Sequence, residues 1–411
     1  MRRLLMVAYY FPPLGGIGSL RAMKLAAYLP ESGWDVTVLA PRRGTYYRDP
    51  TLSFPEEKVV RTGSLELSRA GKAVLAPGTS DTRPARVGPL RRRLRDAARK
   101  WLYRPDPQIG WYPFAVRAGR RVLREGRFDA VFSSSFPITA HLVGRRLHRD
   151  SGLPWVAEFR DPWTDLIAED DPQKAREVAR ERSLVVEATR VVTVSEAWAE
   201  LFRGKGARGV GVVTNGYDAA DLGGGRAPDG IVITHLGSFY SGQQDLSAVW
   251  PALRRLRDAA PARRLRLRFV GDLDAGLRRE IAAHGLEEAL EVTGFLPHRE
   301  ALAQTADSSI LLGAGARDAR PVLKGLIPAK LFEYLGTGLP ILWVGDARTD
   351  AALLLARQPG CFVVPPGDEA SAERALREAL ETPRVARDLE AYTRRALAAR
   401  LAVVLDDACR R

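Results

Sequence analysis

Apolar runs rich in β-branched residues alternate with stretches of helical periodicity along nearly the whole chain, and this alternation restricts its fold more than any other feature. The apolar runs are continuous, as in strands of a parallel sheet that is covered on both faces. We predict strands at 4–8, 36–40, 130–133, 154–158, 191–194, 210–214, 231–236, 266–270, 290–292, 309–312, 341–344 and 361–364. Helices are predicted between them, in the first half at 18–30, 88–102, 111–125, 138–150, 172–189 and 196–203. The chain is therefore predicted to be an α/β protein.

The alternation is interrupted by a turn-rich stretch at 215–230 that has no periodicity, which is typical of a linker. We predict a first doubly wound, Rossmann-like domain at 1–216, a linker at 217–230 and a second such domain at 231–384. The carboxyl ends of the strands in both domains are expected to face a central cleft. The closing helical pattern, at 385–411, is compatible with packing against either domain, including a return to the first.

The composition is that of a globular protein, because 45% of the 411 residues are hydrophobic and 27% are charged. The two cysteines give neither a disulfide framework nor a metal-ligand cluster, so we predict a reducing, cytoplasmic setting. The short apolar run at 4–11 is interpreted as the first strand rather than a signal peptide, since it meets Pro12 and Pro13 without a cleavage site. No segment approaches the ~20 apolar residues that cross a bilayer.

The net charge of +14 comes almost wholly from arginines that are scattered over predicted helices. No nucleic-acid motif accompanies them, so no nucleic-acid partner is predicted, whereas sugar phosphates and lipid headgroups fit the charge. The densest basic run, 83–104, places arginines beside an apolar stripe that includes Trp101. Such a helix either lies on an anionic membrane or packs on the first domain with a solvated outer face. The first interpretation implies peripheral contact with the inner face of the membrane.

Residues 325–342 (GLIPAKLFEYLGTGLPIL) carry the strongest indication of a binding site. Pro328 has a preset φ and no amide hydrogen, so it is predicted to open a helix that ends near Leu335, before a buried strand. Lys330 then lies in the first turn, where free amides and the helix dipole favour an anion, and Glu333 follows on the same face. A cation with free amides suits a diphosphate, and a carboxylate suits sugar hydroxyls. The alternative is an ordinary amphipathic helix with an ion pair.

A glycine-rich loop at 15–19 (GGIGS) follows the first strand. Its bare amides suit a phosphate or another polar group, and its glycines equally suit a tight strand-to-helix turn. The dinucleotide-binding fingerprint is incomplete, because Arg21 occupies the place of the third glycine and no acid ends the second strand. Arg42 and Arg43 suit a 2′-phosphate, so an NADP site is kept as a minor alternative.

Short motifs in both halves occur in the order found in one enzyme family. They are 10–16 (YFPPLGG), 105–111 (PDPQIGW), 155–163 (WVAEFRDPW), 192–196 (VTVSE), 214–218 (TNGYD), 235–238 (HLGS), 269–272 (FVGD), 294–298 (GFLPH) and 325–342. Each motif is weakly specific, whereas their shared order is a strong signal. Over nearly its whole length the chain resembles the retaining GT-B glycosyltransferases of family GT4, in particular the bacterial sugar transferases of polysaccharide and glycoconjugate synthesis.

The resemblance implies that the second domain binds a nucleotide-diphosphate sugar as co-substrate. Lys330 and the amides around Leu331 and Phe332 would meet the diphosphate, and Glu333 would take the ribose hydroxyls. Residues that resemble parts of the base pocket are Gly271, Asp272, Phe295 and Leu296. No cofactor and no catalytic metal are implied, because positive charge and amide dipoles stabilise the departing nucleotide diphosphate.

The first domain would bind the acceptor, which is a glycan, a lipid-linked molecule or another small molecule with a hydroxyl group. By the same resemblance, Gly15 and Gly16 would lie close to the acceptor or to the donor phosphates. The sequence does not specify the nucleotide base, the sugar or the acceptor, because these depend on the paths of loops.

The chain departs from the family pattern at two places in the second half. The family's paired-glutamate motif has its first acid where this chain has Gly325, which leaves the identity of the sugar open. The family often places Arg and Lys after the first strand of the second domain, where this chain has Gln243 and Gln244. A compensating cation is sought among Lys324, Lys330 and Arg317.

Arg160 and Asp161 are the candidates for the catalytic centre, because they follow a predicted strand at the end where open α/β sheets bind ligands. Asp161 would orient the acceptor hydroxyl or the sugar, and Arg160 would oppose developing phosphate charge. The alternative is a structural pair stacked by Trp163. His141 and His298 are interpreted as structural, because neither has a histidine or acid at ligand spacing.

The leading prediction is a metal-independent, retaining glycosyltransferase. A non-catalytic GT-B-like protein that binds a nucleotide or a partner is the first alternative, motivated by Gly325 and by Gln243 and Gln244. An enzyme of the same fold with different chemistry, such as a nucleotide-sugar epimerase, is the second.

Overall fold

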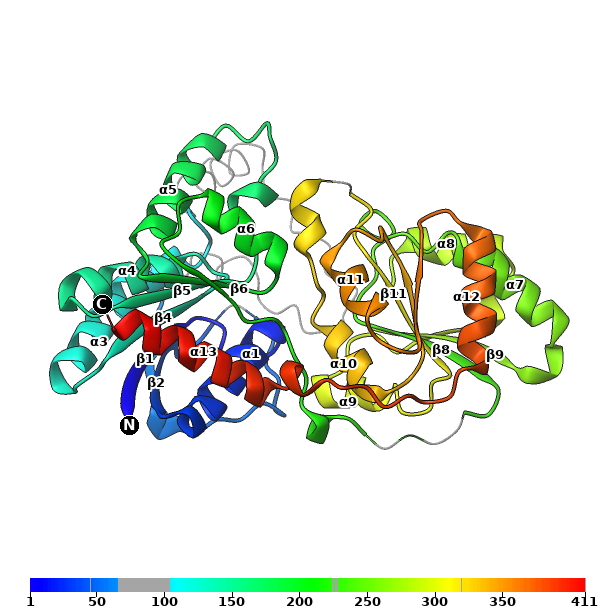
Figure 1. Cartoon of the computed structure of the whole chain (residues 1–411), viewed down its shortest axis with the longest axis horizontal. Coiled ribbons are helices and arrows are strands. Elements are labelled where there is room, and N and C mark those ends of the chain that lie inside the picture. The colour runs from blue at the N-terminus through cyan, green and yellow to red at the C-terminus, as the bar shows by residue number, and fades with distance from the viewer. Residues whose placement is uncertain (45, 66–103, 224, 226–227, 319, 411) are drawn as a thin grey trace, which may run out of the picture. The chain divides into compact units, whose positions relative to one another are not determined.

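The computed structural model describes residues 1–44, 46–65, 104–223, 225, 228–318 and 320–410 (Figure 1). The chain forms two compact units. The first unit consists of Met1–Thr214 together with Arg394–Arg411, and the second consists of Asn215–Thr393. Each unit is built around one parallel sheet, as the continuous apolar runs predicted.

The first unit has a seven-stranded parallel sheet in the order β3-β2-β1-β4-β5-β6-β7. Its strands are β1 (Arg2–Ala8), β2 (Trp34–Pro41), β3 (Val59–Thr62), β4 (Ala130–Ser135), β5 (Trp155–Phe159), β6 (Arg190–Thr193) and β7 (Val210–Val212). Its helices are α1 (Ile17–Tyr28), α3 (Tyr112–Glu125), α4 (Thr139–Ser151), α5 (Lys174–Glu187), α6 (Glu196–Gly204) and α13 (Arg394–Cys409). The order reverses direction after β1, which is the doubly wound arrangement.

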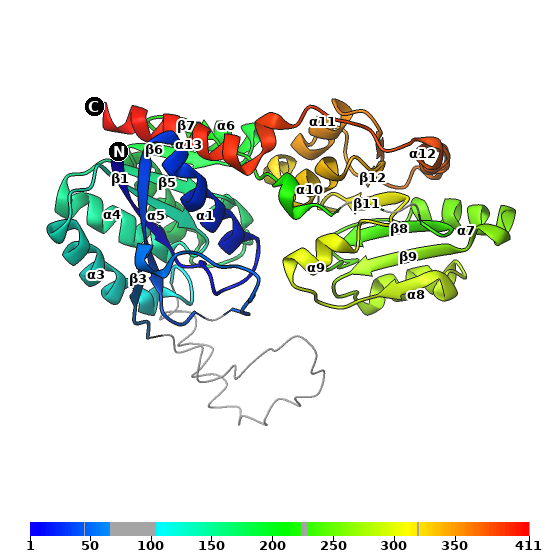
Figure 2. The same ribbon diagram turned by 90° about the horizontal axis from the view of Figure 1, so that it is seen from below.

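One face of this sheet is covered by helices from opposite ends of the chain. Leu20 of α1 shares a hydrophobic cluster with Leu397, Leu401 and Leu405 of α13 and with Leu4 of β1. The helices α3 and α4 lie on the other face (Figure 2). Burial on both faces explains why the strands read as continuous apolar runs.

The second unit has a six-stranded parallel sheet in the order β10-β9-β8-β11-β12-β13. Its strands are β8 (Ile231–Leu236), β9 (Leu265–Val270), β10 (Leu290–Val292), β11 (Ile310–Ala314), β12 (Ile341–Val344) and β13 (Cys361–Val364). Its helices are α7 (Val249–Ala259), α8 (Ala275–Ala283), α9 (His298–Ala303), α10 (Lys330–Thr337), α11 (Asp350–Ala356) and α12 (Glu369–Glu381). One face packs against α7, α8 and α12, and the other against α10 and α11.

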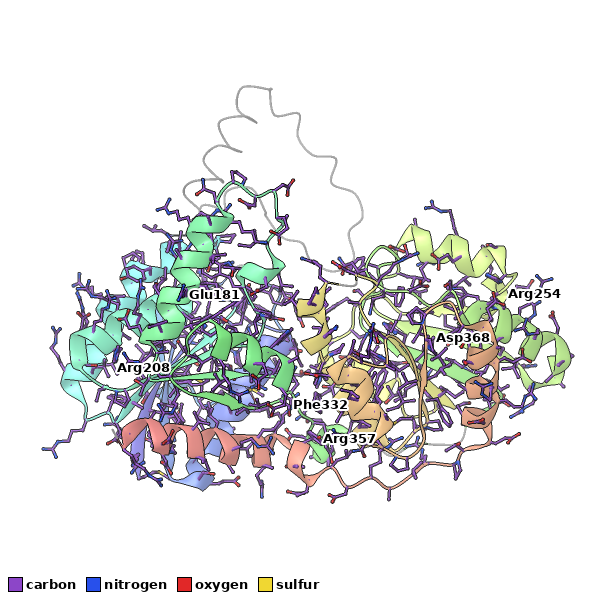
Figure 3. All side chains as sticks on the ribbon, turned by 45° about the horizontal axis from the view of Figure 1, so that its top comes forward. Glu181, Arg208, Arg254, Phe332, Arg357 and Asp368 are labelled. Carbon is purple, nitrogen blue, oxygen red and sulfur yellow. The ribbon has the colours of Figure 1, made fainter. Side chains whose placement is uncertain are left out.

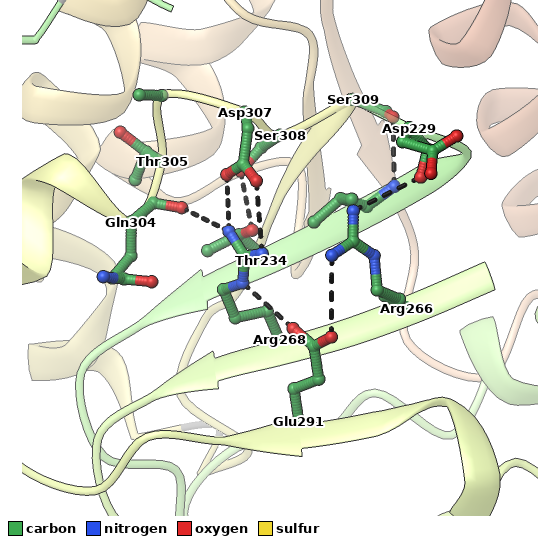
Figure 4. A network of polar contacts seen from close by, with 12 residues as sticks. Asp229, Thr234, Arg266, Arg268, Glu291, Gln304, Thr305, Asp307, Ser308 and Ser309 are labelled. Carbon is green, nitrogen blue, oxygen red and sulfur yellow. Dashed lines mark hydrogen bonds and ion pairs between the residues drawn. The ribbon is translucent and has the colours of Figure 1, made fainter. Parts of the chain in front are cut away.

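A polar network joins β9 to its neighbours in the second unit (Figure 4). Arg268 is 7% exposed, and its guanidinium donates to Glu291 of β10 at 3.2 Å and to Asp307, ahead of β11, at 2.5 Å. Arg268 also donates to the Gln304 carbonyl at 2.9 Å. A buried arginine is tolerated here because its donors meet carboxylate and carbonyl acceptors.

Each predicted strand is present within a few residues of its expected position, and one strand was missed. Val59–Thr62 forms the edge strand β3, whose short sequence includes Arg61 and gives no continuous apolar run. The prediction that the closing helix starts at 385 is wrong, because α13 begins at Arg394. The preceding segment is held along the second unit instead, where the Val385 amide donates to the Gly338 carbonyl at 2.8 Å.

The predicted basic helix at 88–102 and the rest of the run 83–103 lie outside the described residues. Within the part of the chain that the structure describes, no helix combines the length and the apolar character needed to cross a membrane.

Candidate functional site

The segment 325–342 contains α10, but Pro328 lies ahead of this helix rather than at its first position. The helix begins at Lys330 and ends at Thr337, where Gly338 supplies a left-handed cap with a φ of 73°. The predicted end near Leu335 is therefore about half a turn short.

The amides of Leu331 and Phe332, which the resemblance assigns to a diphosphate, have acceptors within the chain. The Leu331 amide donates to the Pro328 carbonyl at 3.0 Å, and the Phe332 amide donates to the Ala329 carbonyl at 3.2 Å. Both side chains are buried in the core of the second unit, where Figure 3 labels Phe332. Their side chains thus fix α10 on the sheet, and the functional groups at this end of the helix are those of Lys330 and Glu333.

The Lys330 ammonium is held by residues at the carboxyl end of β8. Its Nζ donates to the Leu236 carbonyl at 2.7 Å and lies 2.9 Å from Nε2 of His235. Burial lowers the pKa of Lys330 to about 7, although Glu333 acts in the opposite direction. A bound anion would raise this pKa again, so binding of an anion and of a proton to Lys330 are coupled.

Glu333 lies one turn further along α10, and its side chain is almost fully buried. Its Oε1 is 2.7 Å from Nε2 of His298, the first residue of α9. His298 therefore has an acidic partner in the fold, although no acid stands at ligand spacing in the sequence. Local spacing carried no signal for this pair, because 35 positions separate the two residues.

The residues expected in the base pocket follow β9 and β10 at the same sheet edge. Gly271 adopts a φ of 146°, and a Cβ there would lie 2.6 Å from the carbonyl carbon of Gly237. The loops after β8 and β9 can approach so closely only because residue 271 is a glycine. Asp272 is exposed, Phe295 is 37% exposed, and Leu296 is partly buried against the core beneath α10.

The departures from the family pattern lie in the loops after β8 and β11, and the two loops contact each other through Gln243 and Gln244. Gln244 Nε2 donates to the Ala314 carbonyl at 3.2 Å, so its amide joins the two loops. Arg317 donates from its backbone to the Gln243 carbonyl at 2.7 Å and from Nη1 to the Ser241 carbonyl at 3.2 Å. Arg317 therefore brings a largely exposed guanidinium to the loop that lacks its own cations. Gly325 is buried at the end of a short 3-10 helix, Pro321–Gly325, in which Lys324 is exposed.

The glycine-rich loop of the first unit is covered by two tyrosines. The Gly15 amide donates to the Tyr47 carbonyl at 2.9 Å, and the Gly16 amide is hydrogen-bonded to the Tyr47 hydroxyl. A Cβ at Gly15 would overlap the Tyr47 ring, and one at Gly16, where φ is 87°, would lie 2.8 Å from Cε1 of Tyr46. The glycines thus make room for aromatic rings, and both amides have acceptors within the chain.

Arg160 and Asp161 follow β5 directly, at the carboxyl edge of the first sheet. The Arg160 guanidinium donates to the carbonyls of Ser135 and Phe136, and a Cβ at Gly18 would collide with it. Burial raises the pKa of Asp161, and the charge of Arg160 opposes that shift. Backbone carbonyls therefore fix the Arg160 guanidinium in place. The Asp161 carboxylate lies beside it and is partly buried.

Arg21, noted in the sequence only for replacing a glycine, forms a buried ion pair with Glu158 of β5. Arg21 is 4% exposed and Glu158 is fully buried, and their closest atoms, Nη2 and Oε1, are 2.8 Å apart. Arg21 also donates to the Val213 carbonyl at 2.7 Å, and Glu158 Oε2 accepts from Ser134 Oγ at 2.6 Å. Arg21 therefore has a structural role, because it joins α1 to β5 and to the segment after β7. A buried arginine in the place of the third glycine does not fit a dinucleotide-binding fingerprint at this loop.

His141 is fully buried beneath the same sheet, and burial lowers its pKa to about 3. Its Nδ1 is 2.8 Å from Ser133 Oγ, which also accepts a hydrogen bond from Trp155 Nε1 at 2.8 Å. This neutral, enclosed histidine fits the structural interpretation.

An open groove of about 510 Å³ lies on α3 and α4, away from these residues. Arg117, Arg120 and Arg124 of α3 and Arg146 of α4 line it. Among the described residues, no group of three or more histidine, cysteine, aspartate or glutamate side chains is arranged to hold a metal ion.

Two family models match consecutive parts of the chain. Residues 15–218 match the glycosyl transferase 4-like domain, and residues 230–382 match the glycosyl transferases group 1. A putative colanic acid biosynthesis glycosyltransferase, WcaL of Escherichia coli K12, is 29% identical over 117 residues. That alignment covers 28% of this chain, and the chain spans 28% of the length of this curated relative.

Solved structures resemble the chain over its whole length. A sucrose-phosphate synthase from Thermosynechococcus elongatus has a TM-score of 0.60 and 13% identity, covering 100% of this chain and 96% of that one. Anabaena HepE, in complex with UDP-glucose, has a TM-score of 0.58 and 16% identity, covering 100% and 98%. Such similarity shows the fold, which is two Rossmann-like domains of the GT-B type.

Proposed function

The chain belongs to the GT4-type glycosyltransferases of the GT-B fold, and on this premise we propose that it moves a sugar from a nucleotide-diphosphate sugar to a hydroxyl acceptor with retention of anomeric configuration. The products belong to glycan, glycolipid or natural-product synthesis. The HepE structure in complex with UDP-glucose supports a donor of this class.

The observation that carries the proposal is the position of Lys330 and Glu333 at the start of α10. The Lys330 ammonium lies beside the end of β8, and the Glu333 carboxylate lies one turn further on. A lysine is a compact point charge that suits a phosphate, and a carboxylate accepts hydrogen bonds from sugar hydroxyls. The exposed ring of Phe295 would pack against the base.

Asp161 and Arg160 are proposed to act on the acceptor side. Asp161, whose pKa burial raises, would accept a hydrogen bond from the attacking hydroxyl. Arg160 would contribute positive charge where the nucleotide diphosphate departs. In the second unit, Lys330 and Arg317 would stabilise the negative charge of the nucleotide diphosphate.

Calorimetric titration with UDP, GDP, ADP and TDP tests the donor assignment. We expect one of them to bind the wild type, and we expect Lys330→Ala and Glu333→Ala each to weaken binding roughly 10- to 100-fold, as loss of a charged contact does. Arg254→Ala is the matched control, because Arg254 is exposed on α7, away from Phe332 (Figure 3). Unchanged affinity in both site variants would remove the basis of the assignment.

Two alternatives are separated by activity measurements. A non-catalytic nucleotide-binding protein would bind the nucleotide yet show neither transfer nor hydrolysis across a panel of nucleotide sugars. A nucleotide-sugar epimerase would change the donor in the absence of any acceptor. The anomeric configuration of a transfer product, followed by NMR, tests retention.

The acceptor and the location of the protein also belong to the proposal. We propose a glycan, a lipid-linked molecule or another small molecule as acceptor, and a cytoplasmic location with peripheral contact at the inner membrane face. The basic composition of the run 83–104 supports that contact, because arginines beside an apolar stripe favour an anionic lipid surface.

A further inference from the structure

Lys330 does not stand alone at the start of α10, because His235 of β8 lies against it. The His235 side chain is fully buried, and its ring packs near Phe239 and Phe269, with centroid distances of 5.3 and 5.5 Å. The imidazole is therefore held in one orientation by packing as well as by hydrogen bonds.

The hydrogen bonds of His235 fix its tautomer. Its Nδ1 is 3.0 Å from the Leu312 carbonyl, which can only accept, so Nδ1 carries the proton. Nε2 is then an acceptor, and it faces the Lys330 ammonium at 2.9 Å. Burial and the Lys330 charge both lower the pKa of His235 well below its ordinary value, which agrees with a neutral ring.

Two acceptors thus hold the ammonium in place, the His235 imidazole and the Leu236 carbonyl. An ammonium has three hydrogens, so one donor is left for a ligand. A Cβ at Gly237 would lie 3.8 Å from Lys330 Nζ, so the glycine places no side chain against that side of the ammonium. Such an arrangement orders a flexible side chain before the ligand arrives, which increases affinity by lowering the cost of binding.

We propose that His235 is a positioning residue, whose neutral imidazole orders the Lys330 ammonium for the diphosphate of a nucleotide. This inference rests on the proposed function, because it assumes that Lys330 meets a diphosphate. It adds a residue from β8 to a site that the sequence placed on α10.

Substitutions that mimic one ring nitrogen at a time test this role. In His235→Gln the new amide oxygen reaches toward the position of Nε2, so this variant can still accept from Lys330. His235→Asn is shorter and reaches only the position of Nδ1, so Lys330 loses an acceptor. His284→Asn, at the end of α8, is the matched control for replacing a histidine in the same unit.

The readout is calorimetric affinity for the tightest of UDP, GDP, ADP and TDP and for its parent nucleoside. We expect His235→Asn to weaken the diphosphate about 5- to 20-fold and the nucleoside less than twofold, and His235→Gln to stay within about threefold of wild type. Equal losses for both ligands, or full affinity in His235→Asn, would overturn the positioning role.

The pH profile gives a second readout, because Lys330 loses stabilisation of its charged form when an acceptor is removed. The groups that act on Lys330 are His235 from β8 and Glu333 from α10. We expect the loss of affinity with rising pH to begin at a lower pH in His235→Asn than in wild type. An identical profile in the two proteins would contradict the inference.

The Lys330→Ala background separates this inference from the proposed function. There His235→Asn is expected to cause no further loss, because its effect passes through Lys330. If none of the four diphosphates binds wild type, the proposed function fails and the inference fails with it. If wild type binds, Lys330→Ala does not and His235→Asn equals wild type, the inference alone fails.

Discussion

The two sheets have the same doubly wound topology, but the polar groups at their carboxyl edges differ in how they are bonded. In the first unit, the amides of Gly15 and Gly16 are bonded to Tyr47, and Arg21 is neutralised by Glu158. In the second unit, the Lys330 ammonium is hydrogen-bonded to two neutral acceptors at the end of β8, where Gly271 lets the loop after β9 approach closely.

This difference shows that a doubly wound sheet offers an edge for binding, whereas the side chains at that edge decide whether a small anion binds there. In the first unit the amides of Gly15 and Gly16 already have acceptors on Tyr47. In the second unit a cation with a lowered pKa is left to be completed by a ligand. The assignment of the donor to the second unit agrees with this contrast.

The largest effect is expected from breaking the ion pair of the first unit. Arg21→Ala leaves the fully buried Glu158 carboxylate without its hydrogen-bonded cation, which costs about 3–5 kcal/mol of unfolding free energy. Urea unfolding followed by tryptophan fluorescence measures this loss. Arg42→Ala, at an exposed arginine on the same unit, is the control and should change stability by less than about 0.5 kcal/mol.

The pair can also be removed as a whole. Replacing both residues in Arg21→Met with Glu158→Leu should restore much of the stability, because the Glu158 carboxylate is removed together with its hydrogen-bonded cation. A loss as large as that of Arg21→Ala alone would show that packing, rather than charge, dominates at this position.

An intermediate effect is expected from Gly15→Ala. The new Cβ would overlap the Tyr47 ring, and overpacking of this kind costs about 1–3 kcal/mol. In a Tyr47→Ala background the ring is absent, so the same substitution should cost much less, and the double-mutant cycle should give a coupling of at least about 1 kcal/mol. Additive effects would mean that the glycine is required for another reason, such as access to a ligand.

The smallest effect concerns the second unit and the pH dependence of nucleotide binding. The pKa of Lys330 is lowered to about 7, and a bound diphosphate would raise it, so affinity is greatest below pH 7 and falls as pH rises through that value. Between pH 7 and 9, where the phosphates no longer titrate, calorimetry should show a decrease on the order of tenfold. Lys330→Ala should show a flat profile over this range, and a flat wild-type profile would contradict a role for the ammonium.

The sequence predicted the architecture because burial on both faces leaves a local record in each strand. Ile341–Val344, for example, is a continuous apolar run and forms the fully buried strand β12 at the predicted bounds. The edge strand Val59–Thr62 was missed because its four residues include Arg61 and Thr62 and so give no continuous apolar run.

The sequence also placed Lys330 and Glu333 at the start of one helix, but it did not predict their partners. His235 lies 95 positions from Lys330, and Glu158 lies 137 positions from Arg21. These contacts depend on the order of strands in a sheet and on the direction of each side chain. Neither is recorded in local periodicity, so the positioning role of His235 emerged only from the fold.

The return of α13 to the first unit has a consequence for how the protein is made. Leu397, Leu401 and Leu405 complete a core whose members outside α13 all precede Thr214, while Asn215–Thr393 forms the second unit without interruption. During synthesis on the ribosome, the whole second unit is therefore translated before α13, the last helix of the first unit. The half that is translated first is the half that is completed last.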